Sequence, residues 1–124
     1  MSESINAQPE SDADPRLCFV YITAGSQSEA QRISRLLLQA RLAACVNIIN
    51  GMSSIYWWQG RLESSTEVVL IAKTRKSLVP MIIEKAKKAH SYSCPCVVAF
   101  DIVDGNSDYL SWILQETSLI PQDD

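Results

Sequence analysis

The sequence predicts an α+β domain: a ferredoxin-like β-α-β-β-α-β sandwich with a short C-terminal helix. Four segments rich in apolar, β-branched or aromatic residues alternate with two amphipathic segments in that order. The 124 residues are enough for one hydrophobic core and too few for two. In this split β-α-β arrangement we expect both main helices on one face of the sheet, which leaves the other face bare.

The first strand is predicted over 17–23, a continuous apolar run bounded by turn-forming residues. Ser26 and Glu29 have the spacing of a capping box, in which two side chains bond the backbone at a helix start. A helix over 27–40 follows. Its apolar residues recur on one stripe that we expect to face the core: Ala30, Ile33, Leu36, Leu37 and Ala40.

Two long strands, 43–59 and 62–74, are predicted to form a hairpin with a turn at Gln59 and Gly60. The first strand is expected to bend or bulge near Gly51. Both strands exceed the usual length of about five to six residues, so part of the hairpin must overhang a small protomer. Exposed strand edges pair with other chains, and we therefore predict a homo-oligomer.

Three aromatic residues near the hairpin tip, Tyr56, Trp57 and Trp58, are natural contacts in such an assembly. Packing within the core of the protomer is the alternative role for them. The sequence leaves both roles open.

A second helix is predicted after Ser77, which is placed to cap it, and Pro80 is tolerated in its first turn. A fourth strand over 97–103 and a short helix capped by Asn106 or Ser107 complete the domain. The buried stripe of the second helix is predicted to hold Leu78, Met81, Ile82, Ala86 and Ala89.

The polar and acidic residues 1–15 predict a disordered tail before a single domain over 16–124. The tail lacks the features of a secretory signal, and no apolar run approaches the roughly 20 residues of a membrane span. We therefore expect a cytoplasmic protein with no membrane partner. Lys and Arg number 11 against 14 Asp and Glu, and this net charge of −3 excludes a broad basic face for nucleic acid.

The sharpest chemical feature lies between His90 and Cys96, where the only histidine and two of the four cysteines fall within seven positions. Imidazole and thiolate are ligands of copper and zinc, and Cys94 and Cys96 share a face of an extended segment. Cysteine is also often buried as a small, inert apolar residue, and Cys-x-Cys lacks the paired Cys-x-x-Cys motifs of typical zinc sites. Metal binding and inert packing both stay open.

Five motifs follow one another in an order and at intervals that resemble the CutA family of divalent-cation tolerance proteins. They lie at 41–48 (RLAACVNI), 54–60 (SIYWWQG), 67–74, 90–95 (HSYSCP) and 108–112 (DYLSW). The similarity covers about residues 17 to 116. The resemblance implies a ferredoxin-like protomer in a homotrimer, an architecture similar to the PII signalling proteins, and an association with copper and other divalent metals.

The resemblance also implies ligands. The cysteine of the family's Ala-Ala-Cys motif and the histidine of its His-Pro-Tyr motif correspond to Cys45 and His90. With Cys96 and Cys94 they form the predicted metal site near a subunit cleft, for copper or zinc.

Two positions depart from the family pattern. Ser91 stands where the family usually has proline, which restores a backbone N–H and is expected to leave the loop less preorganised. Cys96 stands where the family usually has glutamate, which either biases a site toward Cu(I) or zinc or leaves no site.

Two functions from different classes follow. The first is a trimeric metal-binding protein that takes part in the response to copper or zinc. The alternative is a PII-like signalling or adaptor trimer that binds a small ligand or a partner protein at the subunit clefts, although the sequence has no Gly-rich phosphate loop. We do not expect an enzyme, since the sequence shows no paired acid motif and no Gly-x-Ser-x-Gly.

Overall fold

The structure is a computed structural model that describes residues 16–118. The predicted tail over 1–15 and the last residues of the predicted domain, 119–124, lie outside the described residues. In chain order the elements are β1 (Leu17–Ala24), α1 (Gln27–Gln39), β2 (Cys45–Trp58), β3 (Arg61–Arg75), a 3₁₀ turn (Lys76–Leu78), α2 (Val79–Ala89), β4 (Val97–Asp101) and α3 (Ser107–Glu116).

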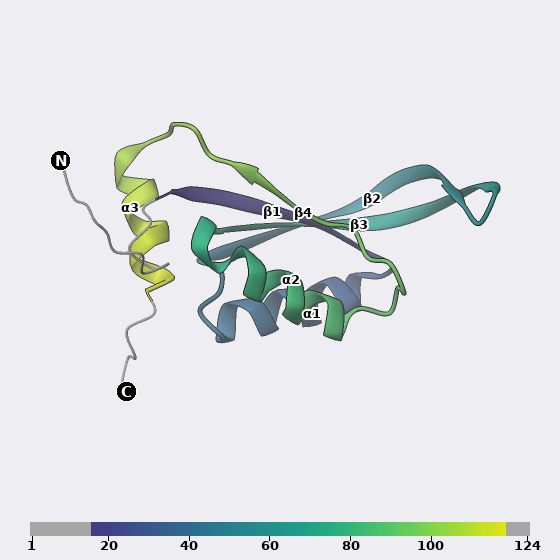
Figure 1. Ribbon diagram of the computed structural model, residues 1–124, viewed down its shortest axis with the longest axis horizontal. Coiled ribbons are helices and arrows are strands. Elements are labelled where there is room, and N and C mark those ends of the chain that lie inside the picture. The colour runs from purple at the N-terminus through teal and green to yellow at the C-terminus, as the bar shows by residue number, and fades with distance from the viewer. Residues whose placement is uncertain (1–15, 119–124) are drawn as a thin grey trace.

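The strands form one antiparallel sheet in the order β2-β3-β1-β4. Helices α1 and α2 cover one face of this sheet, and α3 lies beside one end of it (Figure 1). This is the strand order of a ferredoxin-like sandwich, so the predicted fold of the protomer is confirmed. None of the described helices is long and apolar enough to cross a membrane.

The core lies between the covered face of the sheet and the two helices. Alternate residues of β1 point into it because side chains of a strand alternate between faces. The largest fully buried apolar side chains of this layer are Val20, Ile22, Ile33, Leu37, Leu70, Leu78 and Ile82.

The hairpin of β2 and β3 reaches beyond the two-layer body (Figure 1). Its register shifts between Ile49 and Met52, and Gly51 has a φ of 78°, which confirms the predicted bulge. Strand β3 pairs with β1 only over 68–75, so within the protomer residues 52–67 pair with one another alone. We refer to residues 52–67 as the overhang.

The aromatic residues of the overhang are exposed in the protomer. The side chains of Tyr56, Trp57 and Trp58 are 40%, 74% and 42% exposed in the protomer. The alternative, that they pack within the protomer core, is therefore wrong. The turn is as predicted, with positive φ angles at Gln59 and Gly60 that suit a tight hairpin.

The start of α2 differs from the prediction. Residues Lys76–Leu78 form a 3₁₀ turn, and this turn moves the N-cap position to Leu78, which makes no side-chain cap. The Ser77 hydroxyl is buried and has no hydrogen-bond partner among the described residues. Strand β4 is also shorter than predicted, since pairing with β1 ends at Asp101.

The apolar stripes of the helices are wider than the core that they cover. Leu36 and Ala40 of α1 and Met81 of α2 were expected to be buried and are exposed. Residues on a helix face at spacings of three and four span a broad stripe, and the sheet covers only part of it.

Two arginines hold the C-terminal end of α3. The buried Arg75 donates to the Thr117 hydroxyl at 3.1 Å and to the carbonyl of Leu114. The exposed Arg41 donates to the carbonyl of Glu116 at 3.2 Å and pairs with its carboxylate at 2.8 Å. Cations at a helix C-terminus also suit the helix dipole. At the other end, Asn106 caps the helix, as one of the two predicted alternatives.

Candidate functional site

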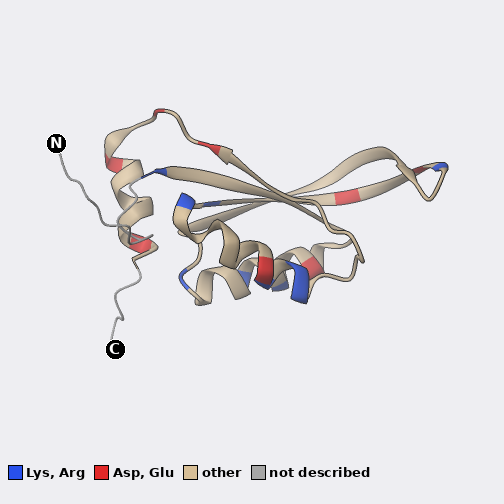
Figure 2. Ribbon diagram, in the orientation of Figure 1, with Lys and Arg blue, Asp and Glu red and all other residues tan. Residues whose placement is uncertain are grey.

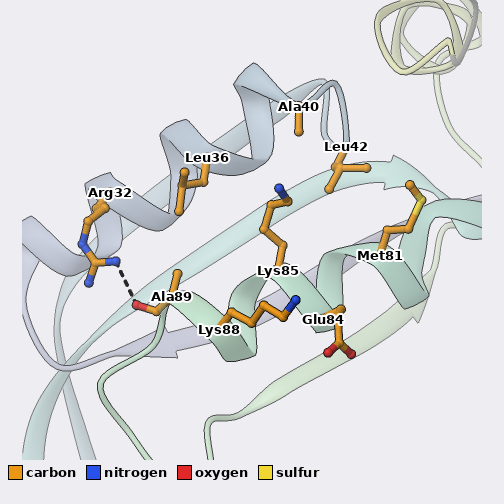
Figure 3. Close-up of a pocket in the computed structure, with 9 residues that line it drawn as sticks. All are labelled: Arg32, Leu36, Ala40, Leu42, Met81, Glu84, Lys85, Lys88 and Ala89. Atoms are coloured by element: carbon orange, nitrogen blue, oxygen red, sulfur yellow. Dashed lines mark hydrogen bonds between the residues drawn. The ribbon is translucent and has the colours of Figure 1, made fainter.

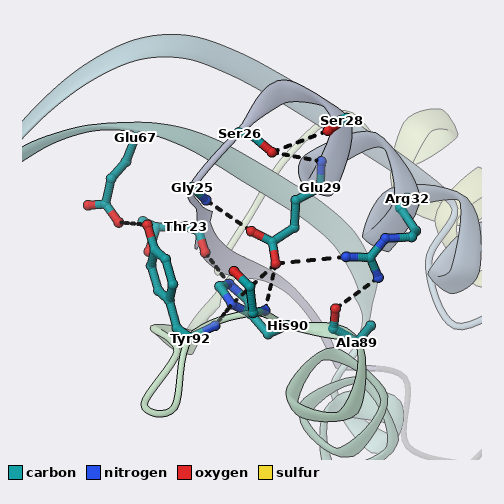
Figure 4. Close-up of polar contacts among 11 residues, drawn as sticks. Thr23, Gly25, Ser26, Ser28, Glu29, Arg32, Glu67, Ala89, His90 and Tyr92 are labelled. Atoms are coloured by element: carbon teal, nitrogen blue, oxygen red, sulfur yellow. Dashed lines mark hydrogen bonds and ion pairs between the residues drawn. The ribbon is translucent and has the colours of Figure 1, made fainter.

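His90 follows α2 directly, and its side chain points inward with an exposed fraction of 0%. Its Nε2 donates to the Thr23 carbonyl at 2.6 Å, and its Nδ1 accepts from the backbone N–H of Tyr92 at 3.0 Å (Figure 4). A donor at Nε2 and an acceptor at Nδ1 define a neutral ring. Both nitrogens are occupied, so neither faces a metal ion in this conformation.

Glu29 joins the start of α1 to the loop after α2. Its Oε1 accepts from the N–H of Gly25 at 3.1 Å, and its Oε2 accepts from the N–H of Ser91 at 2.6 Å. Oε2 also lies 3.7 Å from Nδ1 of His90. Ser26 caps α1 as predicted, but Glu29 reaches one residue further back than a standard capping box would.

The contact at Ser91 reverses our expectation for this position. A serine where the family usually has proline restores an N–H, and that N–H donates to a buried carboxylate. The substitution therefore adds an anchor between the loop and Glu29, and does not leave the loop less constrained at this point.

Burial alone would raise the pKa of Glu29, but hydrogen bonds from the N–H groups of Gly25 and Ser91 outweigh burial and lower the pKa. A lowered pKa in the folded state contributes stability above the pKa of the unfolded chain, and this contribution disappears as pH falls through the folded-state value. We predict that Glu29→Gln destabilises the protein by about 1–3 kcal/mol at pH 7 and by clearly less near pH 3.

Urea unfolding at the two pH values measures this difference. The matched control is Glu84→Gln, which removes an exposed carboxylate and should change stability by less than about 0.5 kcal/mol at either pH. An equal cost of Glu29→Gln at both pH values would contradict the charged role of Glu29.

Tyr92 continues the same cluster toward β3. Its hydroxyl donates to Oε2 of Glu67 at 3.0 Å, and burial together with this carboxylate raises the pKa of Tyr92 to about 12. The ring lies against Gly25, where an added Cβ would sit 3.2 Å from the hydroxyl oxygen. Glycine at this position lets the tyrosine close over the end of β1.

Cys94 and Cys96 lie on the segment that follows, and both are exposed free thiols. The carbonyl of Cys96 accepts from the N–H of Thr23 at 3.4 Å, which ties this segment to β1. Partial burial and the charge of Glu67 raise the pKa of the Cys96 thiol.

Cys45 lies in another part of the sheet. Cys45 of β2 pairs with Lys73 of β3, and Lys73 pairs with Phe19 of β1. His90 binds β1 at Thr23, which is four residues further along that strand than Phe19. Four residues of a strand span about 13 Å, and β3 also lies between, so Cys45 does not meet His90. Its thiol is 3.8 Å from the Asn47 side-chain oxygen.

The predicted set of four ligands is not assembled within one protomer. Among residues 16–118 no group of three or more His, Cys, Asp and Glu side chains is placed to hold a metal ion. The physical reasons are the two hydrogen bonds of His90 and the separate position of Cys45. Of the predicted ligands, Cys94 and Cys96 lie two positions apart on one segment, and both are exposed.

Glu29 and Glu67 belong to this site, although the sequence did not indicate that they bind the loop after α2. The sequence predicts a helix-capping role for Glu29 and places Glu67 at the polar start of a strand. The one signal for Glu67 is an acid directly before three apolar residues that are buried in β3, since a buried carboxylate needs a partner.

The face of the sheet opposite the helices carries a second feature. Phe19 and Phe100 stack with ring centroids 5.2 Å apart, and Tyr21 meets Phe100 edge to face at 6.5 Å. Phe100 is 49% exposed even with these contacts. No described helix covers this aromatic face, which adjoins the overhang.

Comparison with known proteins identifies relatives over most of the chain. The family model for the CutA1 divalent ion tolerance protein matches residues 18–116. The divalent-cation tolerance protein CutA of Archaeoglobus fulgidus is 44% identical over 95 residues, which cover 77% of this chain and 92% of that protein. Its Thermus thermophilus counterpart is 42% identical and covers 79% of this chain, with 95% of that protein matched.

Solved structures of CutA proteins share the fold of this chain. The crystal structure of CutA1 from Oryza sativa has a TM-score of 0.81 and 38% identity, covering 84% of this chain and 95% of that chain. The structure of the CutA protein from Archaeoglobus fulgidus has a TM-score of 0.80 and 41% identity, covering 82% and 99%.

The names of these relatives contradict the cytoplasmic location that we expected. The matching proteins of Oryza sativa and Arabidopsis thaliana are named chloroplastic, and the solved structure from Archaeoglobus fulgidus is named periplasmic. The lack of a secretory pattern in the tail was therefore too weak a basis for that prediction. The names describe tolerance proteins and no reaction. On a family match that spans residues 18–116 and on identities above 40%, the chain belongs to the CutA family of divalent ion tolerance proteins.

Proposed function

We propose that the protein is a homotrimer that binds copper through Cys94 and Cys96 and acts in the tolerance of metal ions. The overhang is the observation that carries the assembly. Residues 52–67 have no strand partner beyond each other within the protomer, and β2 is an edge strand along its whole length. Unpaired strand edges of this length favour pairing with a second chain.

The side chains of the overhang support the same proposal. Ile55, Trp57 and Leu62 share one face, and they are 73%, 74% and 62% exposed. Figure 2 shows charged residues of both signs on the helices, while long stretches of the sheet carry no charge. An exposed apolar strip with few charges is typical of a subunit interface. A stoichiometry of three copies is what the family resemblance implies.

The metal proposal depends on the two exposed thiols. Soft thiolate ligands select Cu(I), whereas a structural zinc site takes four ligands. A pair of thiolates on one short segment therefore favours copper over zinc. Because a bound thiol must lose its proton and the pKa of Cys96 is raised, copper affinity should fall as the pH is lowered.

Copper analysis of the purified trimer tests this proposal. After anaerobic loading with Cu(I) and gel filtration, we expect copper in the wild-type peak and its loss from Cys94→Ser/Cys96→Ser. Cys45→Ser is the matched control, since it also removes a partly exposed thiol, and it should retain the copper. Unchanged copper in the double variant would refute the site, and loss of copper in Cys45→Ser would place the site elsewhere.

A further inference from the structure

A groove of about 630 Å³ runs between α1 and α2 (Figure 3). It lies in the helix layer, on the opposite side of the molecule from the aromatic face of the sheet. Assembly through the overhang and the bare sheet face leaves this groove open. Its lining residues are Arg32, Leu36, Ala40, Leu42, Met81, Glu84, Lys85, Lys88 and Ala89.

The polarity of the groove changes along its length. At one end Ala40 and Leu42 face Met81, and at the other end Arg32 donates to the carbonyl of Ala89 at 2.8 Å (Figure 3). Residues at a spacing of four share a helix face. Along α1 the lining changes from Ala40 through Leu36 to Arg32, and along α2 it changes from Met81 to Lys85 and Lys88 in the same direction. The groove thus has an apolar end and a basic end.

The apolar end is not filled by the protein itself. Met81 is 49% exposed, and Leu36 and Ala40 beside it are exposed as well. These are the residues that their helical spacing assigned to the core. Burying apolar side chains of this size is favourable, so an apolar group lying here would be stabilised.

The basic end carries more positive than negative charge. Arg32, Lys85 and Lys88 line the groove against one carboxylate, that of Glu84. Arg32 donates a hydrogen bond to the carbonyl of Ala89 and lies 3.8 Å from the carboxylate of Glu29. Neither lysine forms an ion pair with any residue of the described part of the chain. In Figure 3 the side chain of Lys85 reaches across the groove toward α1.

We propose that this groove binds a small amphiphile with one anionic head group, of the class of medium-chain carboxylates. The acyl chain lies on the exposed side chains of Leu36, Ala40 and Met81, and the carboxylate lies between Lys85 and Lys88. From Lys88 to Met81 the helix rises by about 10 Å, close to the length of an extended chain of about eight carbons. The volume is within the range of small-molecule sites, about 300–1,000 Å³.

Dodecanoate, used below its micellar concentration, is the probe for this site. Titration followed by calorimetry and by the NMR signal of the Met81 methyl group is expected to show saturable binding of one molecule per chain. The uncharged dodecyl maltoside and the cationic dodecyltrimethylammonium have similar chains, and they should bind at least about tenfold more weakly because charge-assisted bonds are lost.

Variants locate the head group. Lys85→Gln/Lys88→Gln should weaken dodecanoate binding by about tenfold or more. Lys87→Gln is the matched control, because this exposed lysine of the same helix does not line the groove, and it should bind as the wild type does. Absence of saturable binding, equal affinity for dodecyl maltoside, or equal affinities of the two lysine variants would overturn the proposal. Copper loading is independent of this site and should be the same in all these variants.

Discussion

Ile55→Asp/Trp57→Asp is expected to dissociate the proposed trimer into folded protomers. Both side chains lie on the exposed apolar strip of the overhang, where they contribute nothing to the core of the protomer. Loss of a central aromatic contact typically costs about 2 kcal/mol or more, and a trimer contains three copies of Trp57, so the loss of Trp57 alone costs about 6 kcal/mol or more. Sedimentation velocity at micromolar concentration should show the change in mass.

Met81→Asp is the matched control for this variant. It also places a charge on an exposed apolar residue, but in the helix layer, and it should leave the trimer intact. Circular dichroism checks that all variants keep their secondary structure. A double variant that sediments as the wild type does would contradict the role of the overhang, as would dissociation by Met81→Asp.

Arg75→Met is expected to destabilise the protein by about 2–4 kcal/mol, because buried hydrogen bonds to a charged group are lost and their acceptors stay buried. The guanidinium of Arg75 is buried and binds the last turn of α3 through Thr117 and Leu114. Methionine retains much of the apolar length of the side chain and removes its donors. Urea unfolding monitored by circular dichroism measures the loss.

Arg41→Met provides the comparison within the same helix end. Arg41 is about half exposed and pairs with Glu116, and exposed ion pairs contribute only about 0–1 kcal/mol. We therefore expect a small loss for Arg41 and a large one for Arg75. Losses of equal size would mean that burial of the guanidinium does not decide the outcome.

The order and type of the elements could be predicted from the sequence because each carries a local signal. The apolar run of β1, the glycine at position 51 and the asparagine at position 106 act within a few residues of themselves. A bulge or a helix cap needs little information from the rest of the chain. These features are therefore where the prediction and the structure agree best.

The start of α2 and the outer edges of the helices could not be predicted in the same way. Ser77 has the right residue type for a cap, but the chain makes a 3₁₀ turn first. Leu36 and Met81 have the right spacing for a core position, but both are exposed and line the groove between α1 and α2. Periodicity indicates the face of a helix and gives no measure of how much of that face is covered.

The candidate site depends on contacts between distant parts of the chain. Glu29 bonds the N–H of Ser91, and Glu67 bonds the hydroxyl of Tyr92. The sequence indicated a histidine and two cysteines as a chemical cluster, yet the hydrogen bonds of His90 direct its ring into the protein. Short spacing along the chain places residues close together, but it does not determine which way their side chains point.

Sedimentation equilibrium of the wild-type protein at about 1 μM tests the central proposal most directly, because complexes with large apolar interfaces persist at this concentration. The proposal that sister copies cover the overhang predicts a single species of about 41 kDa, three times the 13.8 kDa of one chain. A folded species of 13.8 kDa would contradict it.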